Sequence, residues 1–191
     1  ASNPEEFTTG LRAALAAIVE RTGSFSNVAA NSTRVDAGTQ LFQASYVSGV
    51  WTGELKAYAV STTGVAATAT WNASAGIPAT GRQIFTFDGT SGATFPTAAQ
   101  MAALDRPGPT AADLPVVTGA DNAAYIAGTR TLELANGGAL RNRNHLLGDI
   151  VSSSPAYDPA TGTIYVGAND GMLHAFNATD GTERFGYVPA G

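Results

Sequence analysis

Short runs in which apolar and polar residues alternate occupy much of the chain beyond residue 40, and a period of two is typical of strands. Joints rich in Gly, Ser and Thr separate a first group of runs, at 41–47, 54–61, 67–71 and 83–87. A second group lies near the end of the chain, at 150–154, 163–167, 172–176 and 183–188. The pattern predicts a mainly β fold, with first strands joined by hairpins over 40–90 and a four-stranded meander over 147–191.

The first residues follow a helical period and predict an amino-terminal α-helix over 1–23. Asn3 suits the N-cap, Pro4 suits the first helical position, and Gly23 suits the position just past the end. Apolar residues between them recur every three or four positions and form one stripe. We expect this stripe to pack on the sheet, with partner binding as the alternative.

Residues 91–140 interrupt the strand pattern and predict a partly helical insertion. A short helix is expected at 97–104 and a helical turn near 120–127, with the Pro-rich stretch "DRPGPTAADLP" between them. Connections of this length are uncommon between sheet elements. The segment is therefore either a partner-facing excursion or a decoration of the sheet.

The stretch "IYVGANDGMLHAF" raises a choice between a metal loop and a turn. Calcium loops of the EF-hand kind place oxygen ligands on alternate residues, so that the side chains converge on the ion. Asn169 and Asp170 are adjacent, so their side chains diverge in an extended chain. Asn-Asp-Gly between two apolar runs suits a hairpin turn, because Gly171 tolerates positive backbone angles. We expect a turn and no metal ligands.

A six-residue pattern, G-x-L-x-A-aromatic, occurs twice. It appears as "GELKAY" at Gly53–Tyr58 and as "GMLHAF" at Gly171–Phe176. A single four-stranded sheet cannot bury both of its faces, so repetition of such a unit indicates a propeller or a similar radial array. We expect one domain over 1–191 that forms a partial, modified β-propeller, with 147–191 as one blade and the rest of the ring outside this chain.

Composition and charge exclude several classes of function. The net charge is −5, and nine Arg with a single Lys leave no broad basic face for nucleic acid or an anionic membrane. The absence of Cys excludes disulfides and a cysteine nucleophile. The longest apolar stretch, 11–19, is too short to cross a bilayer. Because no signal peptide is recognisable, we expect an exported protein to be represented here by a mature or internal piece.

The two histidines are the only candidates for imidazole chemistry. His174 lies in an expected strand near Asp170, and this arrangement favours a structural hydrogen bond over catalysis. His145 shares "LRNRNHL" with Arg141 and Arg143. These three residues form either a small basic patch for an acidic partner or a phosphate, or a solvated loop, and the loop is the commoner case.

The other candidate residues have structural explanations as well. Asp149 is expected to cap a turn or to orient Arg side chains. Ser152–Ser154 form a hydroxyl run, but the G-x-S-x-G elbow of hydrolases is missing. Trp51 and Trp71 are expected to fill the space between sheets, with sugar stacking as the alternative. We therefore expect no catalytic, cofactor-binding or metal-binding residue in this chain, and no enzymatic activity.

Three stretches resemble a known family: "WTGELKAY" at Trp51–Tyr58, "LGDIVSSSP" at Leu147–Pro155 and "YVGANDGMLHAFN" at Tyr165–Asn177. They are similar to the PilY family of type IV pilus tip-associated proteins, called PilC in some bacteria, within its carboxy-terminal propeller. The resemblance implies a bacterial cell-surface protein that is exported through the periplasm. It also implies roles in pilus assembly, control of retraction, adhesion and twitching motility. The implied partners are minor pilins and host or surface receptors.

The resemblance transfers no catalytic residue, and the family's Asp-rich calcium loop has no match in this chain. Any calcium site would then lie in the missing part of the propeller. Exposed edges of an incomplete propeller would pair with other strands, so we expect the isolated piece to need the missing blades or to self-associate. Two other classes stay open: a quinoprotein-like propeller enzyme and a periplasmic propeller scaffold for protein assembly.

Overall fold

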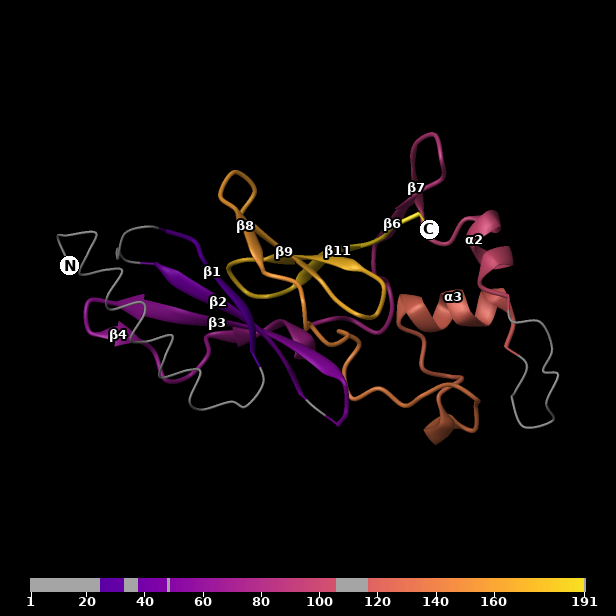
Figure 1. Ribbon diagram of the computed structural model, residues 1–191, viewed down its shortest axis with the longest axis horizontal. Coiled ribbons are helices and arrows are strands. Elements are labelled where there is room, and N and C mark those ends of the chain that lie inside the picture. The colour runs from indigo at the N-terminus through magenta and orange to yellow at the C-terminus, as the bar shows by residue number, and fades with distance from the viewer. Residues whose placement is uncertain (1–24, 33–37, 48, 106–116, 191) are drawn as a thin grey trace.

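Figure 1 shows the computed structural model of the chain, which describes residues 25–32, 38–47, 49–105 and 117–190. A first sheet lies towards one end of the molecule, a second sheet lies in the middle, and two helices lie at the opposite end. The helix expected over 1–23 lies outside the described residues. None of the helices within the described ranges is long and apolar enough to span a membrane.

The first sheet contains β1 (Phe25–Ala30), β2 (Gln40–Val47), β3 (Thr52–Ser61), β4 (Gly64–Val65) and β5 (Trp71–Asn72). Its order is β1-β2-β3-β4, and β5 also pairs with β3. The strands expected at 41–47 and 54–61 are confirmed as β2 and β3. The strand expected at 67–71 is wrong, because most of these side chains are short and exposed, and the chain leaves β3 before it returns at β5.

The second sheet contains β6 (Ile84–Phe87), β7 (Gly92–Thr94), β8 (Ala156–Asp158), β9 (Thr163–Gly167), β10 (Leu173–Asn177) and β11 (Glu183–Val188). Its order is β7-β6-β11-β10-β9-β8. The meander from β8 to β11 is antiparallel, whereas β6 pairs with β11 in parallel. The strand expected at 83–87 therefore exists, but it belongs to the second sheet and is not joined by a hairpin to the first strands.

The strand expected at 150–154 is wrong, and the meander begins instead at Ala156. Residues 147–150 run between the two sheets, where the amide of Gly53 donates to the carbonyl of Leu147 at 3.0 Å. Ile150 is fully buried in the core. This path requires glycine, because a Cβ on Gly53 would lie 2.1 Å from the carbonyl oxygen of Gly148. The start of the run at 150–154 is therefore apolar because Ile150 is buried between the two sheets, and not because the run pairs as a strand.

The helices expected in the insertion are confirmed as α2 (Ala98–Ala103) and α3 (Gly119–Ala127). Each begins with a capping box, in which a Thr side chain accepts from the N3 amide and the N3 side chain accepts from the Thr amide. The Thr residues are Thr97 and Thr118. Short 3-10 turns occur at η1 (Ala73–Ala75) and η2 (Leu134–Asn136).

The core has two parts, and both lie against one face of the second sheet, which we call the inner face. The larger cluster joins the first sheet to the second and includes Phe42, Leu55, Ala57, Ile164, Val166 and Phe176. The smaller cluster joins α2 and α3 to β6 and β11 and includes Ile84, Phe95, Ala123 and Met172. Trp71 packs on the larger cluster and stacks on Phe42, with ring centroids 5.8 Å apart.

The described residues form a mainly β fold, as expected. The chain is organised as two sheets with a helical segment inserted between β7 and β8. Neither sheet closes on itself within the described ranges. The inner face of the second sheet is covered partly by the first sheet and partly by the helices, and His174 lies on this face.

Candidate functional site

A buried group of four charged side chains lies on the inner face of the second sheet, between the two parts of the core. We call Arg82, Asp170, His174 and Glu183 the ionic cluster. His174 is in the middle of β10 and is 0% exposed. Its ring stacks on Phe176 at a centroid distance of 5.7 Å and an angle of 7°. Alternation along β10 explains this position, because both side chains point to the same face.

Both ring nitrogens of His174 contact carboxylates. Nδ1 lies 2.9 Å from Oε1 of Glu183, and Nε2 lies 2.9 Å from Oδ2 of Asp170. Asp170 also accepts from two backbone amides, those of Gly148 at 2.8 Å and Met172 at 3.1 Å. The expected hydrogen bond between the turn aspartate and the strand histidine is therefore confirmed. The hydrogen bond from the Gly148 amide to Asp170 also ties the segment that runs between the sheets to the β9–β10 turn.

Arg82 completes the cluster from the segment before β6. Its Nε and Nη2 donate to the two carboxylate oxygens of Glu183, at 2.6 and 2.7 Å, and both side chains are 2% exposed. The remaining nitrogen, Nη1, donates to the carbonyl of Ala127 at the end of α3, at 3.2 Å. A single guanidinium thus connects β11 to the helical segment, and its planar fork matches the carboxylate.

The charges of the ionic cluster balance when His174 is protonated. Burial by itself would lower the pKa of His174, but the hydrogen bonds to Asp170 and Glu183 outweigh it and raise the pKa to about 9. Burial would likewise raise the pKa of both carboxyl groups, but the hydrogen bonds from His174 outweigh it, so both lie below their ordinary values. Two cations and two anions therefore coexist in the core.

This geometry suits structure better than catalysis. A general base needs a free nitrogen within reach of a substrate, whereas both nitrogens of His174 are hydrogen-bonded to carboxylates and the ring is fully buried. Within the described ranges, no group of three His, Asp or Glu side chains could hold a metal ion. The ionic cluster instead joins β10, β11, the start of β6 and the end of α3.

The Asn-Asp-Gly stretch is a hairpin turn, as expected. It links β9 to β10, and Gly171 has a φ of 88°. The side chains of Asn169 and Asp170 diverge. Asn169 donates to Asp149 at 2.7 Å, whereas Asp170 faces His174. Asp149 was expected to cap a turn or to orient Arg side chains. It fixes this turn, through the side chain of Asn169.

The stretch around Arg143 is a loop that is solvated in part, as expected for Arg141, but Arg143 itself is not solvated. The side chain of Arg143 is 9% exposed and pairs with the buried Glu133 at 2.9 Å. Its Nη1 donates to the carbonyl of Tyr125 at 2.7 Å, and its guanidinium lies over the Tyr125 ring at 3.6 Å. Arg143 thus secures the end of α3, while Arg141 is exposed and His145 is half-buried.

The two tryptophans differ. Trp71 lies between the sheets as expected, and its Nε1 donates to the carbonyl of Ala178 at 3.1 Å. Trp51 does not fill the core, because it is 51% exposed at the tip of the β2–β3 hairpin. Its ring is parallel to that of Tyr46, with centroids 6.3 Å apart. Its backbone φ is 53°, a left-handed value that places Trp51 in the turn rather than in a strand.

The serine run has a structural role. The hydroxyl of Ser153 accepts from the amide of Gly167 at 2.9 Å and so fixes the end of β9. Ser152 and Ser154 are exposed.

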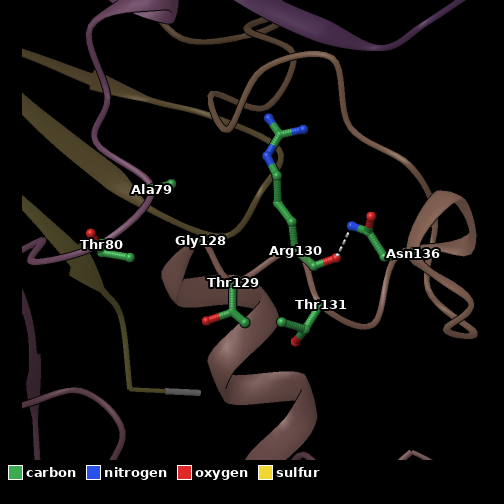
Figure 2. Close-up of a pocket in the computed structure, with 7 residues that line it drawn as sticks. All are labelled: Ala79, Thr80, Gly128, Thr129, Arg130, Thr131 and Asn136. Carbon is green, nitrogen blue, oxygen red and sulfur yellow. Dashed lines mark hydrogen bonds between the residues drawn. The ribbon is translucent and has the colours of Figure 1, made fainter.

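A pocket of about 510 Å³ lies at the end of α3 (Figure 2). It is lined by Ala79, Thr80, Gly128, Thr129, Arg130, Thr131 and Asn136. Asn136 closes one side by donating to the carbonyl of Arg130 at 2.8 Å. The guanidinium of Arg130 points away and donates to the carbonyl of Arg143 at 2.6 Å. The lining therefore offers hydroxyl and amide groups, without a paired acid and base.

Sequence reasoning missed Glu183 as a partner of His174, and Arg82 as the partner of Glu183. These two residues are 101 positions apart, and they meet only because β6 joins the second sheet beside β11. No local pattern indicates that pairing. The signal that was present is a lone arginine just before a strand, in a chain with few charged residues.

The fold and the ionic cluster together define a mainly β structural module. Curated relatives show the family of the chain. The chain is 33% identical to a homolog of the type IV pilus biogenesis factor PilY1 in Xylella fastidiosa, over 99% of the chain and 17% of that protein. It is 34% identical to the type IV pilus biogenesis factor PilY1 of Pseudomonas aeruginosa strain PAK, over 78% of the chain and 16% of that protein. The chain belongs to the PilY1 family.

The chain is also 29% identical to the type IV pilus biogenesis factor PilY1 of Pseudomonas aeruginosa strain UCBPP-PA14, over 99% of the chain and 20% of that protein. The chain thus spans about one sixth to one fifth of the length of these relatives. No family model matches the chain. No solved structure matches it either. The resemblance seen in the sequence is confirmed at the level of the family.

Proposed function

We propose that this chain is a structural, non-enzymatic segment of a type IV pilus biogenesis factor. The observation that carries the proposal is the 33% identity to a PilY1 homolog across 99% of the chain. The geometry supports it, because the charged side chains of the core are bound to one another and hold elements together. The segment is proposed to bind no cofactor, and any calcium site is assigned to other parts of the longer protein.

The finer proposal concerns the fold and the place of action. We infer that the two sheets are part of a larger β-propeller, because they pack face to face and carry two copies of one strand motif. The longer protein is proposed to act at the pilus tip, outside the cell, after export through the periplasm. Its proposed partners are minor pilins and surface receptors. Its proposed roles are pilus assembly, control of retraction, adhesion and twitching motility.

The test is genetic and uses the bacterium that encodes this chain. Deletion of the whole gene should remove sheared surface pili and reduce twitching zones, while the total pilin in the cells stays constant on immunoblots. The intact gene on a plasmid should restore both. A copy with Glu183→Ala should not, because the segment would unfold, whereas Arg141→Ala at an exposed site should restore both. Normal surface pili in the deletion strain would refute the proposal.

The non-enzymatic part has its own test. The purified longer protein is mixed with pyrroloquinoline quinone, calcium and a redox dye, with small alcohols and sugars as substrates. We expect no dye reduction above the rate without protein. Turnover that depends on the quinone would favour the quinoprotein class instead.

A further inference from the structure

Three polar side chains meet on the face of the first sheet that points away from the larger core cluster. Lys56 and Asn72 are partners in the antiparallel pairing of β3 with β5. Paired residues point to the same face, with Cβ atoms about 5 Å apart. Glu54 lies two positions before Lys56 on β3, so its side chain joins them on that face. We call Glu54, Lys56 and Asn72 the triad, and all three residues are half-buried.

The carboxylate of Glu54 binds both of the other side chains. The ammonium of Lys56 donates to Oε2 of Glu54, and Nδ2 of Asn72 donates to Oε1 at 3.4 Å. The side-chain oxygen of Asn72 accepts two further hydrogen bonds from the buried Ser74, from its amide at 3.1 Å and from its hydroxyl at 2.8 Å. An amine, a proton acceptor and a polarised amide carbonyl therefore occupy one small site.

The choice of base at this site also needs an explanation. Nine of the ten basic side chains of the chain are arginines, and an arginine fork binds a carboxylate better than an ammonium does. Lys56 is the one lysine. A lysine can give up its proton and attack a carbonyl carbon, whereas an arginine stays protonated. The residue that binds Glu54 is thus the one basic side chain that can act as a nucleophile.

The triad contains the parts needed to join a lysine to an asparagine. Such a reaction needs a base for the amine, donors for the developing oxyanion and an acid for the leaving nitrogen. Glu54 contacts both nitrogens, and Ser74 supplies two donors to the oxygen. Groups held on one carboxylate also meet at a high effective concentration. We propose that Lys56 and Asn72 form an intramolecular amide bond, with Glu54 as the catalytic acid and base.

The reaction balances within the site. Glu54 accepts a proton from the ammonium of Lys56, and the neutral amine attacks Cγ of Asn72 to form the new C–N bond. Glu54 then gives the proton to Nδ2, the Cγ–Nδ2 bond breaks, and ammonia leaves. The new amide nitrogen returns its second proton to Glu54, from which the ammonia takes it up as ammonium. No oxidant, water or cofactor is consumed. Each chain reacts once, so the triad confers no turnover on other molecules.

The bond would secure a short strand of the first sheet. β5 contains two residues and pairs with β3 at two positions. Trp71 of β5 packs on the larger core cluster and donates to the carbonyl of Ala178, just after β10. A covalent tie from β5 to β3 would therefore help to hold the first sheet against the second. This consequence goes beyond the proposed function and does not depend on it.

Peptide mapping of the longer protein tests the bond directly. The protein is purified from the bacterium, denatured and digested with trypsin, which cuts after unmodified Arg34, Lys56 and Arg82. We expect one peptide over 35–82 that is uncut at Lys56 and about 17 Da lighter than its sequence, because ammonia is lost. Fragment spectra should place the link between Lys56 and Asn72.

Two outcomes of the mapping would overturn the proposal. One is complete cleavage after Lys56, with both peptides at the masses of their sequences. The other is the same loss of mass in a peptide that is still cut after Lys56, which would indicate a succinimide at Asn72.

Matched variants of the longer protein separate catalysis from structure. Glu54→Gln keeps the size of the side chain but cannot take up a proton, so the rate of linking should fall about 100-fold or more. Ser74→Ala removes one of the two donors to Asn72 and should slow linking about 100-fold. Lys56→Arg should abolish the bond. The control is Ser153→Ala, which removes a structural serine hydroxyl elsewhere and should leave the rate unchanged.

The rates come from a pulse of heavy-isotope arginine in growing cells, followed by mapping at increasing times, and circular dichroism shows that each variant is folded. Linking of folded Glu54→Gln or Ser74→Ala at the unchanged rate would overturn the assigned chemistry. The bond and the biogenesis role can fail separately. Normal surface pili in the deletion strain would refute the role and leave the bond in place, whereas a map without the linked peptide would refute the bond alone.

Discussion

The two copies of the G-x-L-x-A-aromatic motif have the same backbone form but opposite orientations relative to the core. In β3, Leu55 and Ala57 are fully buried between the sheets. In β10, Phe176 and His174 occupy that place, while Leu173 is on the opposite face of the second sheet. A two-residue alternation defines two faces without saying which one the fold covers. The neighbours of each strand decide that.

The residue at the middle of each motif shows the consequence of this difference. Lys56 lies on the face of β3 away from the larger cluster, where it pairs with Glu54 and both side chains keep about a quarter of their exposure. His174 at the same place in β10 is fully buried and needs two carboxylates. One motif therefore carries a surface ion pair in one sheet and a buried cluster in the other.

The largest effect should come from removing one buried carboxylate. Glu183→Ala would leave Arg82 and His174 without their shared partner. We expect a loss of about 3–5 kcal/mol in the free energy of unfolding, because uncompensated buried charges are costly. The matched change at the surface pair, Glu54→Ala, should cost about 1 kcal/mol or less in chains that lack the bond between Lys56 and Asn72. Urea denaturation followed by tryptophan fluorescence measures both. Similar losses would show that the burial of the ionic cluster does not matter.

The next effect is the pH dependence of stability. The raised pKa of His174 adds stability that is fully present below the ordinary value of 6.5 and is lost as the pH rises through about 9. The lowered pKa values of Asp170 and Glu183 add stability that is present above their ordinary values and is lost in acid. Between pH 6.5 and 9, we expect stability to fall by about 3 kcal/mol.

The control for this pH dependence is His174→Gln, which keeps hydrogen-bonding groups in β10 but cannot titrate. Denaturation midpoints of the variant should stay nearly constant from pH 6.5 to 9, although the variant is less stable throughout. A slope that persists in the variant would assign the pH dependence to another group.

A smaller difference is expected between the two motif leucines. Leu55→Ala removes a fully buried side chain and should cost about 3 kcal/mol. Leu173→Ala removes a side chain that is 37% exposed, so it should cost about 1 kcal/mol. Urea denaturation of the two variants measures the difference, and equal losses would contradict the opposite orientations of the two motif copies.

Local patterns predicted much of this fold. The runs at 163–167 and 183–188 match β9 and β11, and the Asn-Asp-Gly turn between β9 and β10 has the predicted form. The Thr residues that cap α2 and α3 also act locally. These features depend on residues a few positions apart, so the sequence carries them directly.

Features that depend on distant residues could not be predicted in this way. The parallel pairing of β6 with β11 joins residues about 100 positions apart, and the bond between Arg82 and Glu183 depends on it. Arg143 resembled a surface residue because its neighbours are polar. It is buried because η2 and α3 bring Glu133 and Tyr125 next to it. Tertiary contacts overrode the local pattern in both cases.

The smallest expected difference between a variant and its control concerns the glycine that begins the second motif copy. Gly171 has a φ of 88°, and a Cβ there would have no atom within 4 Å. Gly171→Ala should therefore cost only the backbone strain of about 1–2 kcal/mol. The control is Gly92→Ala in β7, where the space is equally open and φ is not positive, so no strain is expected. Equal stability of the two variants would contradict a positive φ at Gly171, in the turn that sets Asp170 against His174.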